Sequence, residues 1–273
     1  MELGREILEF TRTDLARLFR SGKALVLLVL YGLIEAAGGV IFALVAESPA
    51  GQLMSSGLLA IVASGGDKAM QEHLQQIPVP ILFAYWFTLF VMPPLVLLMG
   101  FDQISGELST RSVRYLAFRS RRISWALGKA LAQVVALFGL SLAANLVVLV
   151  FSLATVPGIA FASALGWLLE LWLLSLIYGA AYVGLVTLIS TLFRTPFLAL
   201  AAGALALVGL GMAGLLARWI DSIHFVSYAL PGSYASGLIS PELSVAAGSA
   251  AALLGFAVVF LSGAVGVLQV RDL

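Results

Sequence analysis

The sequence contains no cysteine and very few charged residues. Only 11% of its 273 residues are Asp, Glu, Lys or Arg, whereas soluble domains average about 25%. Without cysteine there are no disulfides, thiolate metal sites or cysteine nucleophiles in this sequence. The scarcity of charge, together with 61% hydrophobic residues, excludes a soluble globular enzyme and a disordered chain. A polytopic membrane protein remains, in which the positions of the few charges matter more than their sum.

Sequence motifs of enzymes are missing as well. The Gly-Lys pairs at 22–23 and 128–129 lack the upstream glycine of a phosphate-binding loop, so we expect no nucleotide-hydrolysing site in this chain. The two histidines, His73 and His224, lie in different segments outside the apolar runs and form no metal-ligand pattern. We therefore expect a protein that is not an enzyme, with no cofactor or metal of its own and no nucleic-acid partner.

Long uncharged stretches predict six membrane-spanning helices. A helix needs about 20 mainly apolar residues to cross a hydrocarbon core of roughly 30 Å, and continuous apolar runs argue against barrel strands. The predicted fold class is an all-α polytopic membrane protein, with residues 1–273 as a single transmembrane domain. The expected spans cover residues 24–46, 80–101, 130–151, 166–190, 196–217 and 245–268.

Lysine and arginine residues concentrate on one side of these spans. Cationic residues in short loops mark the cytoplasmic side of a membrane protein. With six spans, all of the 15 Lys and Arg residues except Lys68 and Arg218 fall on one side. The pattern of charge therefore predicts that both termini are cytoplasmic.

Two cytoplasmic elements hold most of these cations. Residues 1–23 predict an amphipathic helix in the membrane interface, on which Asp14 is the one acidic residue of the apolar face. The loop 102–128 predicts a short helix capped by Ser105, with Glu107 in its first turn. Composition alone leaves open whether these elements only set the topology or also bind a cytoplasmic partner.

Polar or helix-breaking residues also occur inside the expected spans. Glu35 lies near the middle of the first span, where a carboxylate costs about 2.5–3.5 kcal/mol on insertion scales. Either it lines a substrate path or holds a proton, or it is protonated and hydrogen-bonded to a neighbouring helix. Pro93 and Pro94 remove backbone hydrogen bonds from the second span and predict a kink, which is tolerated where the freed carbonyls face protein or a cavity.

A sparse motif runs through the loop after the second span. It consists of an aspartate, a Gly-Glu pair, a threonine, an arginine and a Gly-Lys pair: Asp102, Gly106, Glu107, Thr110, Arg121 or Arg122, Gly128 and Lys129. With the order of the elements, this motif resembles the permease subunit of ABC exporters of the ABC-2 type, near the nitrous-oxide-reductase-maturation permease group. Many relatives have a proline shortly before the loop arginine, where this sequence has Phe-Arg-Ser at 118–120.

The resemblance implies half of an ATP-driven transporter in a bacterial inner membrane. Two such permeases, as a homodimer or with a related permease, would pair with separate cytoplasmic ABC ATPase subunits that bind ATP and Mg²⁺. The loop would supply the coupling helix that contacts the ATPase. The candidate coupling residues are Asp102, Glu107, Arg111, Arg114, Arg121, Arg122 and Lys129. The candidate residues of a translocation path are Glu35, Pro93 and Pro94.

Two other classes of protein remain open. A secondary transporter driven by an ion gradient would use Glu35 as its proton or ion site, although we find no internal repeat between residues 1–130 and 131–273. A membrane assembly subunit without transport activity would need no coupling loop. The apolar spans favour a lipid, a drug or a hydrophobic peptide as substrate, and a polar substrate along the dimer seam is the alternative.

Overall fold

The computed structural model describes residues 3–46, 68–110, 121–155, 158 and 160–271, which form helices and no strand. The first part of the chain contributes α1 (Leu3–Arg20), α2 (Gly22–Ala46), α4 (Lys68–Gln75), α5 (Val79–Gly100) and α6 (Ser105–Ser109). The second part contributes α8 (Arg122–Thr155), α9 (Phe161–Leu192), α10 (Pro196–Trp219), η1 (Asp221–Ala229), η2 (Pro231–Tyr234), α11 (Ala235–Leu238) and α12 (Leu243–Val270).

Five helical segments in the described part of the chain are long and apolar enough to cross a membrane. They are the segment Val79–Ser109, the bulk of α8, and α9, α10 and α12. The first predicted span, 24–46, falls on α2, a helix of 25 residues, in which the described residues show a shorter apolar helix, Leu25–Glu35. Five of the six predicted spans are therefore confirmed, and the chain has the architecture of a multi-pass helical membrane protein.

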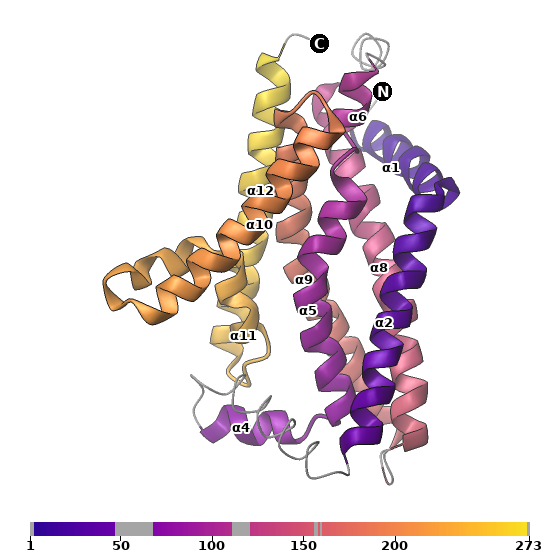
Figure 1. The fold of residues 1–273 in the computed structure, drawn as a ribbon, viewed down its shortest axis with the longest axis vertical. Helices are drawn as coiled ribbons and strands as arrows, with labels where there is room; N and C mark the ends of the chain where they lie inside the picture. The colour runs from indigo at the N-terminus through magenta and orange to yellow at the C-terminus, as the bar shows by residue number, and fades with distance from the viewer. Residues whose placement is uncertain (1–2, 47–67, 111–120, 156–157, 159, 272–273) are drawn as a thin grey trace.

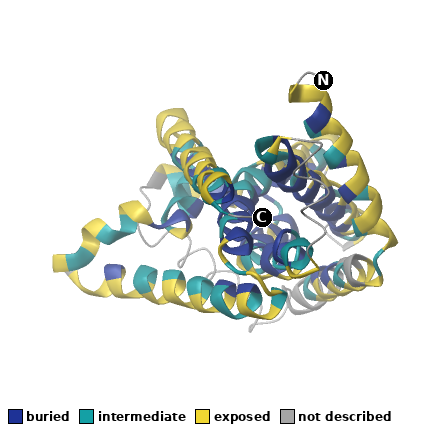
Figure 2. Ribbon diagram, turned by 90° about the horizontal axis from the view of Figure 1, so that it is seen from above, coloured by how far each residue is buried: buried dark blue, intermediate teal, exposed yellow. Residues whose placement is uncertain are grey.

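The helices form an elongated bundle with α9 at its centre. α9 contacts α5, α8, α10 and α12, and α2 packs on α5 and α8. Figure 1 shows α1, α6 and the C-terminal end of α12 together at one end of the bundle, with α4 and α11 at the opposite end. The buried residues lie in the middle of the bundle, and exposed residues follow the outer helices (Figure 2).

A second, smaller apolar core lies at the end of the bundle that contains α6. Ile104, Trp125, Ala126 and Leu268 form it, and Phe10 of α1 packs against it. Because these residues come from α1, α8, α12 and the turn before α6, the small core joins segments that are distant in the sequence. The polar contacts of the candidate functional site lie next to this small core and share Trp125 with it.

The segment between the last two long helices forms three short helical elements. It contains η1, η2 and α11, and η1 extends away from the bundle beside the end of α10 (Figure 1). After α2, the described residues resume at α4.

The contact between α9 and α12 depends on a glycine. A Cβ atom built on Gly184 would lie 2.9 Å from the carbonyl oxygen of Ala257 and 3.2 Å from its Cα. Both are backbone atoms of α12, so they cannot move away as a flexible side chain would. Small residues at helix contacts allow this kind of close approach in membrane proteins.

We expect Gly184→Ala to destabilise the protein by about 1–3 kcal/mol, the usual cost of overpacking a core. The matched control is Gly209→Ala in α10, where a new Cβ meets nothing within 4 Å. The measurement is the thermal unfolding temperature of each purified variant in the same detergent. Equal unfolding temperatures for the two variants would contradict the close packing of α9 on α12.

Candidate functional site

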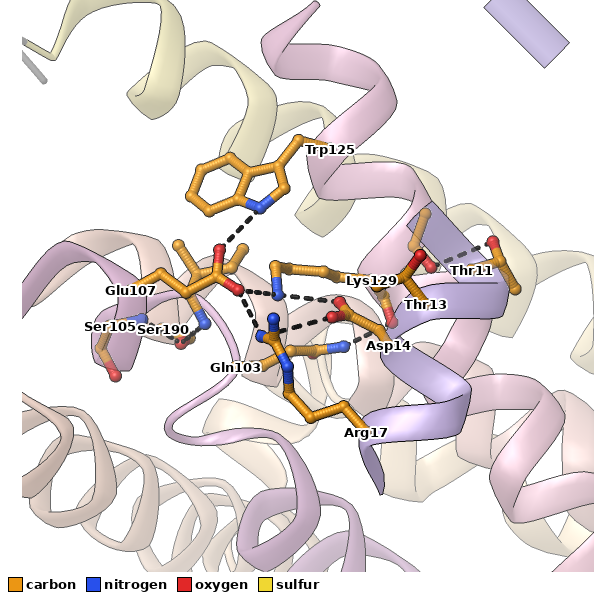
Figure 3. A network of polar contacts seen from close by, with 12 residues as sticks. Thr11, Thr13, Asp14, Arg17, Gln103, Ser105, Glu107, Trp125, Lys129 and Ser190 are labelled. Atoms are coloured by element: carbon orange, nitrogen blue, oxygen red, sulfur yellow. Dashed lines mark hydrogen bonds and ion pairs between the residues drawn. The ribbon is translucent and has the colours of Figure 1, made fainter. Parts of the chain in front are cut away.

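Four charged side chains form a closed ring between α1, α6 and α8 (Figure 3). Lys129 Nζ lies 2.8 Å from Asp14 Oδ2 and 2.9 Å from Glu107 Oε1. Arg17 Nη1 lies 2.6 Å from the same Glu107 oxygen and 3.5 Å from Asp14 Oδ1. This charge ring, Asp14, Arg17, Glu107 and Lys129, contains two cations and two carboxylates and is therefore neutral.

The charge ring is buried except at Arg17. The side chains of Lys129, Asp14 and Glu107 are 2%, 9% and 14% exposed, and that of Arg17 is 63% exposed. Burial of a charge is unfavourable unless an opposite charge and hydrogen bonds compensate it. The hydrogen bond to Glu107 raises the pKa of the Arg17 guanidinium, so this pair stays charged at neutral pH.

Neutral groups complete the coordination of Lys129 and Glu107. Trp125 Nε1 donates a hydrogen bond to Glu107 Oε2 at 3.0 Å. The Lys129 ammonium also lies 5.8 Å from the centre of the Trp125 ring, within the range of a cation–π contact. Gln103, in the turn before α6, donates to the carbonyl oxygen of Lys129. Trp125 and Lys129 are one turn apart on α8, so both reach the same carboxylate.

Gly128 allows α1 to approach α8 closely. A Cβ atom at this position would lie 2.5 Å from Phe10 Cβ and 3.0 Å from the carbonyl oxygen of Ile7. Thr11 Oγ1 donates a hydrogen bond to the Gly128 carbonyl oxygen at 3.2 Å. The two residues of the Gly-Lys pair thus have separate structural roles, since the glycine admits α1 and the lysine binds its carboxylate.

Glu6 of α1 lies at the start of α8. Its Oε2 accepts a hydrogen bond from Ser124 Oγ at 2.8 Å and from the Arg121 backbone N–H at 3.5 Å. The first N–H groups of a helix lack partners in the helix, and a negative charge there is favourable. The hydrogen bond from Ser124 lowers the pKa of Glu6, which keeps the side chain ionised.

The start of α6 is held by a residue of α9. Ser190 Oγ accepts hydrogen bonds from the backbone N–H groups of Ile104 and Ser105 at 3.1 and 3.0 Å, and donates to the Phe101 carbonyl at 2.9 Å. The prediction that Ser105 caps this helix is wrong. The N-cap is Ile104, so Ser105 is the first residue of the helix, and its hydroxyl donates to the Phe101 carbonyl oxygen.

Arg122, a predicted coupling residue, binds the C-terminal end of α12. Its Nη1 lies 2.6–3.0 Å from the carbonyl oxygens of Leu268, Gln269 and Arg271. In turn, Arg271 donates to the Thr191 carbonyl near the end of α9. Cations at helix C-termini satisfy free carbonyls and the negative end of the helix dipole. Arg122 therefore has a structural role in joining α8 to α12.

The other predicted coupling residues are spread over this end of the bundle. Asp102 lies half-buried in the turn between α5 and α6, and the Arg121 side chain is exposed. Arg111 and Arg114 lie outside the described residues. Of the predicted set, Glu107 and Lys129 form an ion pair, with Lys129 Nζ 2.9 Å from Glu107 Oε1.

Glu35 lies in a separate polar cluster between α2 and α5. It is 1% exposed, and its Oε1 accepts a hydrogen bond from Thr88 Oγ1 at 3.2 Å. The predicted translocation-path prolines, Pro93 and Pro94, are farther along α5, which continues through them from Val79 to Gly100. Glu35 therefore has the hydrogen-bonded neighbouring helix that one of the two sequence interpretations required.

Sequence reasoning missed several members of these clusters. Asp14 had a signal, since it is the acidic residue on an otherwise apolar helix face, but nothing identified its partner. Arg17 counted only among the cations that indicate topology, and Trp125 was not singled out as a site residue. Ser190 and Thr88 gave no signal, because a serine or threonine inside an apolar run satisfies its own helix in most cases. No group of three or more potential metal ligands occurs in the described part of the chain.

Neither a comparison with protein-family models nor one with curated proteins finds a match for this sequence. The fold and the site define the class by themselves. It is a multi-pass helical membrane protein with a buried, neutral charge ring at one end and a carboxylate between two of its helices.

We expect Lys129→Met to destabilise the protein by about 3–5 kcal/mol, because it leaves two buried carboxylates with only Arg17. The control is Arg5→Gln, which removes an exposed ion pair to Glu9 at 3.6 Å and costs no more than about 1 kcal/mol. Thermal unfolding of both purified variants measures the difference. If Lys129→Met unfolds at the temperature of the control, the ring does not hold α1 and α6 to α8.

We expect Arg122→Gln to loosen the last turn of α12, since hydrogen bonds from a charged donor contribute about 1.5–3 kcal/mol. Hydrogen exchange followed by mass spectrometry should show about tenfold faster exchange near Leu268. Arg121→Gln, in which the neighbouring exposed side chain is changed, should leave exchange there unchanged. Equal exchange in the two variants would mean that Arg122 does not cap α12.

Proposed function

We propose that this chain is the membrane-spanning permease subunit of an ATP-driven exporter of the ABC-2 type. It pairs with a separate cytoplasmic ABC ATPase subunit, which supplies the ATP and Mg²⁺ site, and moves a hydrophobic substrate across a bacterial inner membrane. In this proposal α2 also crosses the membrane, as the first of six spans. Both termini are cytoplasmic, and α6 is the coupling helix. The basis is the motif of the loop after α5 and the geometry around it.

The distribution of cations supports the proposed orientation. Figure 1 shows α1, α6 and the C-terminal end of α12 at one end of the bundle, and Arg122 and Arg271 join the start of α8 and the end of α9 to that end. The described cations in these elements and next to them are Arg5, Arg12, Arg17, Arg20, Arg121, Arg122, Lys129, Arg194 and Arg271. Arg218 ends α10 at a distance from this group (Figure 1). A cationic end is the cytoplasmic end in most membrane proteins, and a cytoplasmic ATPase would meet it.

The charge ring is the observation that carries the proposal. An ATPase that closes when it binds ATP must move the spans through rigid contacts. Glu107 of α6 is bound at once to Lys129 of α8 and Arg17 of α1. A displacement of α6 is therefore passed to the N-terminal helix and to a long apolar helix together. A flexible loop carrying the same charges would absorb that displacement.

The proposed pairing of two permeases is supported by uncovered apolar surface. Leu205, Val208, Met212 and Leu215 are all exposed on α10. Apolar helix faces in a membrane are covered by lipid or by another subunit. A second copy of this chain or a related permease has room to pack there.

A transporter driven by an ion gradient is the second candidate, and burial of Glu35 favours it. A carboxylate at this depth is a candidate proton or ion site by default. The two candidates differ in their energy source, so the discriminating observation is which one the transport consumes. Depletion of ATP stops an ABC exporter, whereas a protonophore stops a proton-driven transporter.

The first test is copurification. A tagged chain purified from its native host in mild detergent should bring down, in comparable amount, a protein with a G-x-x-x-x-G-K-[ST] loop that hydrolyses ATP. A gene for such a protein next to this one would give the same indication. A purified complex that contains no nucleotide-binding subunit would contradict the proposal.

The second test uses Glu107→Gln in that complex. We expect ATP turnover coupled to the permease to fall about tenfold or more, since loss of one partner from a buried ion pair costs well over the 1.4 kcal/mol that a tenfold change represents. Arg218→Gln is the matched control, with a charge removed away from the charge ring. The unfolding temperature is measured in parallel, so that loss of turnover in a folded complex is distinguished from misfolding. Unchanged turnover in Glu107→Gln would rule out α6 as the coupling helix.

A further inference from the structure

The polar cluster around Glu35 consists of three side chains from two helices. Thr88 Oγ1 of α5 donates to Glu35 Oε1 at 3.2 Å. The Tyr31 hydroxyl lies 2.9 Å from Thr88 Oγ1 and also within hydrogen-bond reach of the Glu35 carboxyl group. Tyr31 and Glu35 are one turn apart on α2, so both face α5. All three side chains are buried, at 1–3% exposure.

In the described part of the chain, the partners of the Glu35 carboxyl group are neutral side chains. On α5, Tyr85 is the one titratable residue between Val79 and Gly100, and α8 has none after Lys129. The charged residues of α1 lie at the end of the bundle, where Asp14 and Arg17 belong to the charge ring. An ionised carboxylate in an apolar bundle needs a cation or several strong donors. Two hydroxyl groups do not meet that need, so the neutral acid is the form that fits this site.

The second carboxyl oxygen of Glu35 identifies where the proton sits. Oε2 is buried and has no hydrogen-bond partner among the described residues. Because Thr88 donates to Oε1, the acid hydrogen belongs on Oε2. Loss of this proton breaks only its O–H bond, and the electron pair stays on the carboxylate. The proton is accepted by water, which must enter between α2 and α5 to solvate the new charge.

We propose that Glu35 is a proton-binding site at the contact between α2 and α5, occupied in this structure, and that release of the proton separates the two helices at this point. The site binds a proton rather than a metal ion, because two hydroxyl groups and one carboxyl group are too few ligands to hold a metal ion. It requires no ATPase and therefore stands independently of the proposed exporter function. In a transporter of either kind, it would make the position of α2 depend on protonation.

Infrared spectroscopy tests the protonated state directly. The difference spectrum between wild type and Glu35→Gln, in neutral buffer and detergent, should show the carbonyl band of a protonated carboxylic acid. The band should be lost reversibly as the pH of the wild-type sample is raised. A difference spectrum with carboxylate bands only would overturn the proposal. Glu35→Gln is the neutral isostere of the protonated acid, so a failure of this variant to fold would overturn it as well.

The sequence contains no cysteine, so paired spin labels can follow the contact without background labelling. Leu30→Cys on α2 and Phe90→Cys on α5 place labels at exposed apolar positions of the two helices. We expect the interlabel distance to lengthen at alkaline pH with Glu35 present and to stay constant with Glu35→Gln. A background of Glu170→Gln, which removes an exposed carboxyl group of α9, should keep the pH response. Equal behaviour with and without Glu35, whether moving or static, would overturn the proposed separation.

Discussion

The neutralisation of one buried ammonium group organises the charged end of this protein. Lys129 is almost completely excluded from water, and its ion pairs go to Asp14 of α1 and Glu107 of α6. A buried lysine without such partners would lose its charge or unfold its surroundings. The need to neutralise Lys129 therefore holds both α1 and α6 against α8. Gly128 makes the arrangement possible, since any larger residue would keep α1 at a distance.

The ends of the helices follow a second common rule, in which the free backbone groups of one helix are satisfied by a side chain from another. Glu6 serves the start of α8, Ser190 the start of α6, and Arg122 the end of α12. Each of these contacts joins segments that are more than 80 residues apart. Cations of the kind that indicate the topology of a membrane protein can therefore also hold its helices together, as Arg122 does here. Cations with exposed side chains, such as Arg121, are available to a partner.

The two buried acidic sites solve the problem of desolvation in different ways. At the end of the bundle, Glu107 is paired with cations and remains charged, so the contact is strong over a wide pH range. Between α2 and α5, Glu35 has hydroxyl partners alone, and the proton itself supplies the neutrality. The first solution suits a rigid connection between helices, and the second suits a contact that is made and released.

Hydropathy and charge patterns were enough to predict the helical class, five of the long apolar helices, the helical first segment and the gathering of cations at one end. These features depend on hydropathy and charge over short windows, so they are readable without partners. The sequence also flagged Asp14 as an acidic residue in an apolar face, without a reason for it. The ion pair of Asp14 with Lys129, the binding of Ser190 to the start of α6 and the binding of Arg122 to α12 could not be predicted from the sequence. Those contacts depend on which distant helix ends lie side by side, and the packing of the whole bundle sets that.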